Sequence, residues 1–309
     1  MSTGKSASRN TYLGVACVLL GAIGFSAKPT LVKLGYQYSV DPMTLLALRM
    51  LFSLPFFMLM ALWSRGSGTA VPLMRKDWLA VLGLGFIGYY LSSLMDFTGL
   101  QYISAGLGRL VLFLYPTLVV LLSALVLKQP IRARHAVSLA ISYGGIALVF
   151  LDYVSLGEDL GSIALGTALV FGSAFTYAVY LVAGSRVVLR IGSVRFTAFA
   201  SIAASFFVLL HFALTHDLAA LRVAHEVYWV SLVMAVFATV LPMWLVAEGL
   251  KRIGASRAAL IACIGPVSTL ILSYLVLAEP ITAVQVAGAA LVLVGVGLVS
   301  VRPKANTAA

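Results

Sequence analysis

Long apolar stretches alternate with short polar segments along the whole chain. A membrane-spanning helix needs about 20 mainly apolar residues, and these stretches are continuously apolar, whereas barrel strands alternate apolar with polar residues. The pattern therefore predicts an all-α membrane protein with ten transmembrane helices. Their predicted bounds are Tyr12–Leu34, Met43–Trp63, Trp78–Leu100, Ala105–Leu127, Ala133–Leu151, Ile163–Ser185, Phe196–Leu214, Tyr228–Leu250, Arg257–Leu277 and Val284–Val301.

Composition supports this interpretation. Hydrophobic residues make up 61% of the 309 residues, charged residues only 10%, and the mean hydropathy is +1.05, which exceeds the usage of soluble domains. The polar head and first apolar run resemble a secretory signal. However, the run continues to about Leu34, longer than the apolar region of a signal peptide, so we interpret it as the first membrane helix.

The positive charge does not indicate a nucleic-acid partner. The formal net charge is +11, but the basic residues lie between apolar spans and form no continuous basic face. Cys17 and Cys263 both fall inside apolar spans, which argues against a disulfide framework. We expect no metal and no cofactor, because no cluster of Cys and His has metal-ligand spacing.

Basic residues predict the orientation, because Lys and Arg concentrate in cytoplasmic loops. With the N-terminus inside, the outer segments carry only Lys33 and Arg222. The inner segments carry Lys5, Arg9, Arg65, Arg75, Lys76, Lys128, Arg132, Arg134, Arg186, Arg190, Arg195, Lys251, Arg252, Arg257, Arg302 and Lys304. The outer acidic residues are Asp41, Asp152, Glu158, Asp159, Asp217, Glu226 and Glu279. We therefore predict a multi-pass protein of the cell (inner) membrane with both termini cytoplasmic.

The chain repeats itself with an offset of 150 residues. Identities include Pro116 with Pro266, Pro130 with Pro280 and Gly145 with Gly295. Five predicted spans separate equivalent positions, and five is odd, so the halves are expected to lie in opposite orientations. The predicted repeats are residues 12–151 (helices 1–5) and 161–301 (helices 6–10). Such 5+5 inverted-topology repeats are typical of transporters.

Several motifs resemble the two EamA repeats of the drug/metabolite transporter (DMT) superfamily. The matching stretches are Tyr102–Leu107, Leu114–Pro116, Arg252–Leu260, Gly265–Pro266, Leu277–Pro280, Gly288–Gly295 and Ala47–Arg49. The resemblance covers essentially the whole chain. It implies a ten-helix 5+5 inverted repeat with a central cavity, and an exporter of amino acids, other metabolites or drugs, although some members are importers. The chain departs from the family pattern at Lys128–Pro130 and at Arg109, which occupies a normally apolar stretch.

Ionisable residues inside predicted spans are candidates for function, because a charge at the bilayer centre is costly. Lys28, Arg49, Asp96 and Arg109 fall in the predicted outer half, and Glu248 lies near the inner end. One interpretation pairs Asp96 with Arg49 or Arg109 as a structural bridge, while Lys28 extends outward to water. We favour a structural role for Arg49 and a cavity-lining role for Lys28 and Arg109.

Helical spacing aligns further residues with these charges. The candidate substrate-binding residues are Phe25, Lys28, Tyr89, Ser93, Arg109, Phe113, Tyr177, Tyr180, Trp244 and Cys263. Helix packing is the alternative explanation for the aromatic residues. Pro116 and Pro266 lack an amide donor and free the carbonyls of Leu112 and Ala262, so they are candidate hinges or static kinks.

Together these patterns predict an alternating-access carrier that exports a small organic solute, such as an amino acid or a related metabolite, as a monomer or homodimer. The surplus of cations suggests that the solute is anionic, with Lys28 or Arg109 as its direct partner. Asp96 and Glu248 lie toward opposite span ends, which favours facilitated diffusion or exchange over obligatory proton antiport.

Three alternatives to this carrier are an uptake carrier for an organic anion or nucleoside-like metabolite, a passive channel and an intramembrane enzyme. An enzyme is not expected, because the four histidines, His135, His211, His216 and His225, lie at span ends or in loops.

Overall fold

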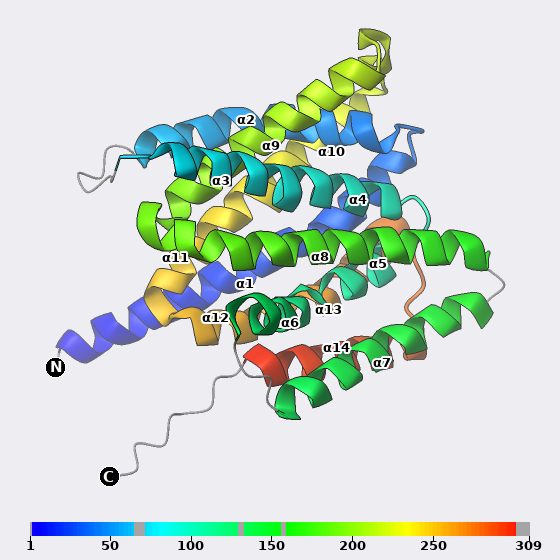
Figure 1. The fold of residues 1–309 in the computed structure, drawn as a ribbon. Helices are drawn as coiled ribbons and strands as arrows, with labels where there is room; N and C mark the ends of the chain where they lie inside the picture. Colours follow the sequence, from blue (N-terminus) through cyan, green and yellow to red (C-terminus); the bar gives the residue numbers. More distant parts are fainter. Residues whose placement is uncertain (1, 65–71, 129–132, 156–158, 301–309) are drawn as a thin grey trace.

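The chain folds into a bundle of helices that run between two ends of the molecule (Figure 1). The structure is a computed structural model that describes residues 2–64, 72–128, 133–155 and 159–300. Every regular element among these residues is a helix. The predicted all-α class is therefore confirmed.

The elements of the first half follow in chain order. They are α1 (Ser2–Tyr36), α2 (Pro42–Trp63), α3 (Arg75–Gly85), the π-helix η1 (Phe86–Leu91), α4 (Ser92–Gly99), α5 (Ala105–Leu112), α6 (Tyr115–Leu127) and α7 (Ala133–Ser155). The start of α2 follows from its sequence. Asp41 accepts hydrogen bonds of 2.9 Å from the amides of Met43 and Thr44, and Pro42 needs no amide partner in the first turn.

The second half contains the remaining helices. They are α8 (Leu160–Ile191), α9 (Ser193–Thr215), the 3₁₀-helix η2 (Leu218–Leu221), α10 (His225–Ala235), the π-helix η3 (Val236–Val240), α11 (Leu241–Ile253), α12 (Ala255–Ala262), α13 (Gly265–Leu277) and α14 (Ala283–Ser300). Since π-helical turns are rare and often occur at functional sites, η1 and η3 are candidate positions for such a site.

Eight helical segments of the described chain are long and apolar enough to cross a membrane. They cover the first eight predicted spans and run over Thr11–Tyr36, Pro42–Trp63, Arg75–Gly99, Ala105–Val126, His135–Val154, Leu160–Ile191, Ser193–Thr215 and His225–Ile253. The ninth and tenth predicted spans fall on shorter apolar helices, Gly265–Leu277 and Ala283–Leu298. Val301, the predicted end of the tenth span, lies outside the described residues.

Irregular features recur at the offset found in the sequence. The π-helix that begins at Phe86 has a counterpart that begins at Val236, and α5 and α6 correspond in the same way to α12 and α13. Lys128 and Ala278 end α6 and α13 in the left-handed conformation, with φ of 52° and 54°. Figure 1 shows α5 and α12 at opposite ends of the molecule. The repeat is thus visible in the elements as well as in the residues.

Small residues bring neighbouring helices into close contact. On the interface of α7 with α14, a Cβ added to Gly145 would lie 2.7 Å from the carbonyl oxygen of Gly288. On the interface of α1 with α11, a Cβ on Gly249 would lie 2.9 Å from the carbonyl oxygen of Gly14. Van der Waals packing through small residues is how helices associate in lipid, where no hydrophobic effect drives them together.

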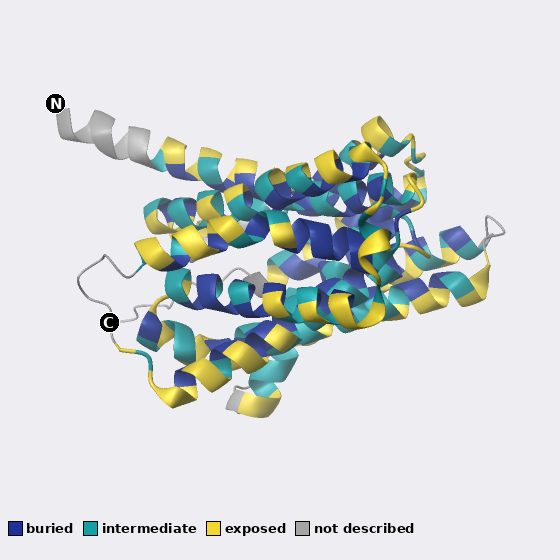
Figure 2. Ribbon diagram, turned by 90° about the horizontal axis from the view of Figure 1, so that it is seen from above, coloured by how far each residue is buried: buried dark blue, intermediate teal, exposed yellow. Residues whose placement is uncertain are grey.

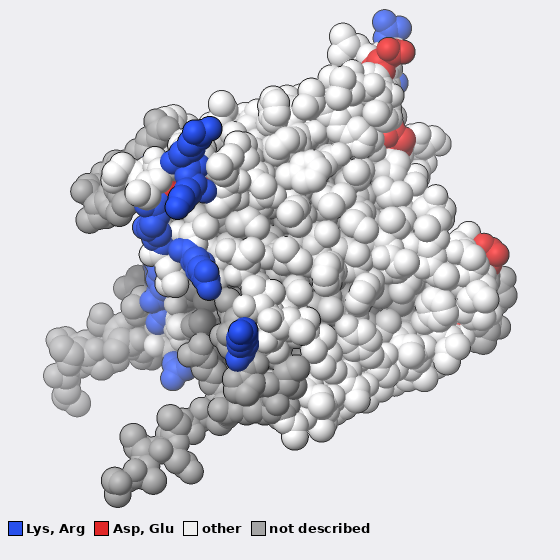
Figure 3. All heavy atoms as spheres, in the orientation of Figure 1, with Lys and Arg blue, Asp and Glu red and all other residues white. Residues whose placement is uncertain are grey.

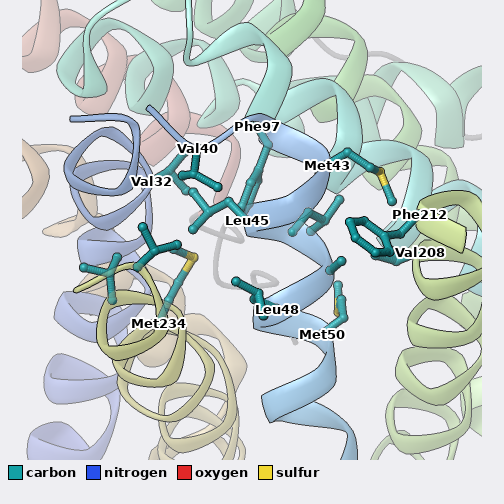
Figure 4. Close-up of a cluster of buried hydrophobic side chains, with 14 of the residues drawn as sticks. Val32, Val40, Met43, Leu45, Leu48, Met50, Phe97, Val208, Phe212 and Met234 are labelled. Atoms are coloured by element: carbon teal, nitrogen blue, oxygen red, sulfur yellow. The ribbon is translucent and has the colours of Figure 1, made fainter. Parts of the chain in front are cut away.

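Apolar side chains occupy both the interior and the outward faces of the bundle. One interior cluster joins α1, α2, α4, α9 and α10, with Leu45, Phe97 and Met234 fully buried (Figure 4). Exposed residues cover the outward faces (Figure 2) and include large apolar side chains such as Trp63, Leu125 and Leu189, exposed by 71%, 77% and 88%. A helix bundle that is apolar outside as well as inside is suited to lipid.

Charged residues separate to the two ends of the molecule. In Figure 3, most Lys and Arg gather at the end where α3 begins and α8 ends, and most of the visible Asp and Glu lie at the opposite end. Arg65, Arg132, Glu158, Arg302 and Lys304, which contributed to the predicted asymmetry, lie outside the described residues. Among the described residues, Arg75 at the start of α3 and Arg190 in the last turn of α8 lie at the basic end, as the sequence indicated.

Candidate functional site

A buried ion pair joins α1 to α4. Lys28 Nζ lies 2.7 Å from Asp96 Oδ2, and the two side chains are only 17% and 2% exposed. This contact differs from the interpretation in which Asp96 pairs with Arg49 or Arg109 and Lys28 extends outward, while the favoured cavity-lining role of Lys28 stays a prediction. Lys28 instead turns inward, because Asp96 on the neighbouring helix compensates its charge better than a long reach to the surface.

Arg49 links the two halves of the chain. Its Nε donates a hydrogen bond of 3.2 Å to Thr239 Oγ1 in η3, and the Thr239 hydroxyl donates to the carbonyl of Met234. The guanidinium also lies 5.5 Å from the centre of the Phe97 ring, a cation–π distance. Arg49 is 6% exposed, and its Nη1 is buried without a hydrogen-bond partner.

Arg109 also reaches from the first half to the second. It lies in the last turn of α5, where a cation is favoured by the helix dipole. Its Nη2 donates a long hydrogen bond of 3.4 Å to Ser26 Oγ. A Cβ added to Gly265, the first residue of α13, would lie 2.9 Å from the same nitrogen. Arg109 Nε is buried without a hydrogen-bond partner.

Ser26, the hydrogen-bond partner of Arg109, is itself held in place by hydrogen bonds. Its hydroxyl donates to the carbonyl of Ala22 at 2.6 Å, and the carbonyl of Ser26 accepts a 2.8 Å hydrogen bond from Thr269 Oγ1 of α13. The sequence analysis missed Ser26, Thr269 and Thr239. Small hydroxyl residues at membrane depth are the signal that points to them, since they form hydrogen bonds between helices.

Aromatic side chains form a continuous group beside these charges. Tyr89 of η1 packs edge-on against Tyr180 with ring centres 5.0 Å apart, and Tyr180 stacks on Tyr177 at 5.8 Å. Tyr177 contacts Tyr115 at 5.3 Å, and Tyr115 contacts Phe113 at 6.3 Å. Phe113 lies 5.9 Å from the Arg109 guanidinium. The structure thus brings together the four predicted aromatics Tyr89, Phe113, Tyr177 and Tyr180, and adds Tyr115.

Two of the other predicted residues are half-buried and one is buried. Phe25 lies on α1 one residue before Ser26 and is half-buried, as is Cys263, which follows α12 directly. Cys263 packs against the interior cluster that contains Phe113. Ser93 is buried at 8% exposure on α4, one turn before Asp96. These residues stay candidates for contact with a solute.

Trp244 and Glu248 do not join the charged group. Pro242 and Val246 of α11 face the glycines of α1, so Trp244, two residues from each, lies on the opposite side and is 52% exposed. A contact of Trp244 with a solute stays a prediction. Glu248 forms local ion pairs with Arg252 at 2.9 Å and Lys251 at 3.3 Å, which is a surface arrangement at the basic end.

The two predicted hinge prolines lie where helices break. Phe113 and Leu114 interrupt the helix between α5 and α6, and Cys263 and Ile264 interrupt it between α12 and α13. Pro116 and Pro266 occupy the first turns of α6 and α13, where a missing amide costs nothing. Irregular backbone at membrane depth is tolerated where it is buried in protein or lines a cavity. Whether these breaks act as hinges stays a prediction.

Two cavities open at the acidic end of the molecule. The larger, about 590 Å³, is lined by Lys33, Tyr36, Asp41 and Glu279 among others, and the smaller, about 270 Å³, shares Lys33 and Glu279. The Tyr36 hydroxyl donates a 2.7 Å hydrogen bond to the carbonyl of Phe97, the neighbour of Asp96. Tyr36, which lines the larger cavity, therefore contacts the residue that follows Asp96 in the chain.

No group of three or more His, Cys, Asp and Glu side chains with the geometry of a metal site occurs in the part of the chain that the structure describes. Apolar spans, interrupted helices and buried charges that touch both halves define a multi-pass membrane protein of the transporter class. The chain belongs to the EamA-like transporter family, whose model matches residues 12–151 and 164–301.

Relatives agree with this assignment. The chain is 31% identical over 295 residues to the uncharacterized transporter YcbK of Bacillus subtilis (strain 168), covering 92% of this chain and 91% of the relative. It is 26% identical to the uncharacterized transporter sll1319 of Synechocystis, with 95% and 94% covered. A solved crystal structure superposes with a TM-score of 0.61 at 19% identity, covering 94% of this chain and 95% of the other, which supports the fold alone.

Proposed function

We propose that this protein is an alternating-access carrier that exports a small organic solute, such as an amino acid or a related metabolite, across the cell membrane. In this proposal the ten apolar helical segments cross the membrane as two inverted sets of five, with residues 12–151 and 161–301 as the repeats and both termini in the cytoplasm. The recurrence of η1, α5 and α6 as η3, α12 and α13 supports it.

The observation that carries the proposal is a buried polar site shared by both halves. Arg49 of the first half binds Thr239 of the second, and Arg109 lies against Gly265 at the start of α13. A solute held between two halves that rock against each other gains access to each side in turn. A channel would need a continuous pore with a ring of charges or carbonyls, whereas Arg49 and Arg109 contact the facing half of the chain directly.

The proposed site also bears on energy coupling. Asp96 is the carboxylate of this buried group, and Lys28 contacts it at 2.7 Å. A carboxylate held by an ammonium is poorly placed to carry protons in each cycle. We therefore propose facilitated diffusion or exchange, and a pH gradient that drives the solute uphill in proteoliposomes would overturn this part of the proposal.

Reconstitution tests the proposed function. A thermal-unfolding screen of the purified full chain against amino acids, organic acids and nucleosides identifies candidate solutes, since a ligand that binds the folded state raises the Tm. Proteoliposomes preloaded with a candidate should then accumulate the labelled form by saturable counterflow, and protein-free liposomes serve as the control. Linear, non-saturating flux would favour a channel, and uptake into inside-out vesicles distinguishes export from import.

A further inference from the structure

The buried site contains more positive than negative charge. Lys28 is paired with Asp96, and Arg49 and Arg109 are near enough to both to interact with them electrostatically. Two guanidinium groups are left, and each has one buried nitrogen without a hydrogen-bond partner, Nη1 of Arg49 and Nε of Arg109. Removing one partner from a buried charge is strongly destabilising, so this arrangement calls for an anion that is not part of the chain.

The other carboxylates of the described chain do not supply that anion. They lie at helix ends and in loops, where they contact nearby side chains or backbone amides. Asp77 pairs with Arg190, Glu248 with Arg252 and Asp152 with Thr282. Asp41 and Asp159 cap α2 and α8, Asp217 directly precedes η2, and Glu226 lies 3.3 Å from His225. Glu279 accepts a hydrogen bond from the amide of Ala105 at the acidic end. None of these groups shares the position of Arg49 and Arg109.

The surroundings of Arg109 increase the positive potential further. Its guanidinium lies against Gly265, the first residue of α13, and a helix start carries partial positive charge. The hydroxyl of Ser26 is its partner at 3.4 Å, and that hydroxyl is itself donating to Ala22. Neutral, distant contacts of this kind do not balance a half-buried guanidinium, whereas carboxylates bind arginine through short, charge-assisted hydrogen bonds.

We propose that the solute of this carrier is an organic acid without an ammonium group, whose carboxylate is bound by Arg49 and Arg109. This inference rests on the proposed function and narrows it. A zwitterionic amino acid would bring an ammonium as well as a carboxylate, and Asp96, the carboxylate of the site, is occupied by Lys28. In this proposal Lys28 is a positioning residue for Asp96, and Arg109, the other predicted partner, binds the solute directly.

The group of Tyr89, Phe113, Tyr115, Tyr177 and Tyr180 fits the remainder of such a solute. It extends from Arg109 along α6 and α8 to η1 through ring contacts of 5.0 to 6.5 Å. Its ring faces offer apolar contact, and its hydroxyls offer hydrogen bonds. The carboxylate is therefore held at the arginines while the body of the solute lies against the aromatic residues.

The test compares defined probes on the full-length protein in detergent and in proteoliposomes. Succinate and pyruvate are the anionic probes, and alanine and leucine are the zwitterionic probes. We expect at least one anion to raise the Tm and to show counterflow, and neither zwitterion to do so. Counterflow of alanine or leucine without any anion would overturn the inference while the proposed function stands. No counterflow of any probe would overturn both for this set of solutes.

Variants separate binding from folding. Arg49→Gln and Arg109→Gln should each weaken anion binding by about tenfold or more, while the ligand-free Tm stays unchanged or rises, because an uncompensated buried charge has been removed. Arg222→Gln, which removes an exposed cation outside the spans, is the matched control and should bind as the wild type does. Loss of folding in both buried variants, or wild-type anion binding by both, would assign the arginines a structural role and overturn the inference.

Discussion

A single buried ion pair shows how strongly one residue depends on its neighbour in this protein. Lys28 and Asp96 lie 2.7 Å apart, and Asp96 is 2% exposed, so each charge is compensated almost entirely by the other. The net stability of a buried pair is small because both charges lose their hydration. Removal of one partner, however, leaves the other charge alone in a low-dielectric interior.

Replacement of Asp96 tests this dependence. Asp96→Asn should lower the free energy of unfolding by about 3–5 kcal/mol, because Lys28 keeps its charge without a counter-ion. The double variant Lys28→Gln/Asp96→Asn should recover most of that loss. Thermal and denaturant unfolding of the purified protein in detergent measure both effects. Additive losses in the double variant would show that the two residues do not act as a pair.

At the scale of elements, the interruptions of the helices carry the most information. Pro116 and Pro266 in the sequence indicated the two breaks, since proline removes an amide donor and disfavours a continuous helix. The π-helices at Phe86–Leu91 and Val236–Val240 were not predicted, because no residue type marks a π-turn and its extra residue is accommodated by tertiary packing.

Gly265 at the second break allows the arginine to approach α13. In Gly265→Ala the new Cβ would meet Arg109 Nη2 at 2.9 Å and Ser26 Oγ at 3.3 Å, and the flexible end of the arginine can move away. We therefore expect little loss of stability but about tenfold weaker anion binding, since the guanidinium is displaced from its position. Gly83→Ala, where a Cβ has nothing within 4 Å, is the control. Wild-type binding by the Gly265 variant would contradict the placement of the site.

The pairing of α7 with α14 allows a matched test of helix contact. A Cβ on Gly145 would lie 2.7 Å from the Gly288 carbonyl oxygen, whereas the adjacent Gly144 has open space around it. Gly145→Ala should therefore destabilise the protein by about 1–3 kcal/mol. Gly144→Ala should be neutral or slightly stabilising, because alanine favours helix. The free energy of unfolding in detergent distinguishes the two variants. Equal values would contradict the expectation that close contact between α7 and α14 stabilises the protein.

At the scale of the whole molecule, the sequence predicted the class, the repeat and the segregation of charge, because lipid requires long apolar helices and the repeat copies residues directly. It did not predict which charges pair. Helical periodicity places Asp96 on a face of its own helix, but whether Lys28 or Arg49 reaches that face depends on the distance and rotation between helices. The same limit explains Trp244, since Pro242 and Val246 turn the other face of α11 toward α1.

The separation of charge between the two ends of the molecule (Figure 3) leads to a test of orientation. Ser193 begins α9 at the basic end, and Ala219 lies in η2 between α9 and α10 at the other end. Basic ends of membrane proteins face the cytoplasm. In a variant in which Cys17 and Cys263 are replaced by serine, Ala219→Cys should react with an impermeant maleimide in intact cells, and Ser193→Cys should react only after the membrane is opened. Labels on opposite sides require an odd number of membrane crossings between Ser193 and Ala219. Since α9 is the only long helix between them, the same result supports a single crossing by α9. Labelling of Ser193→Cys in intact cells, with Ala219→Cys protected, would invert the proposed orientation and would place α1 and its basic N-terminal segment outside.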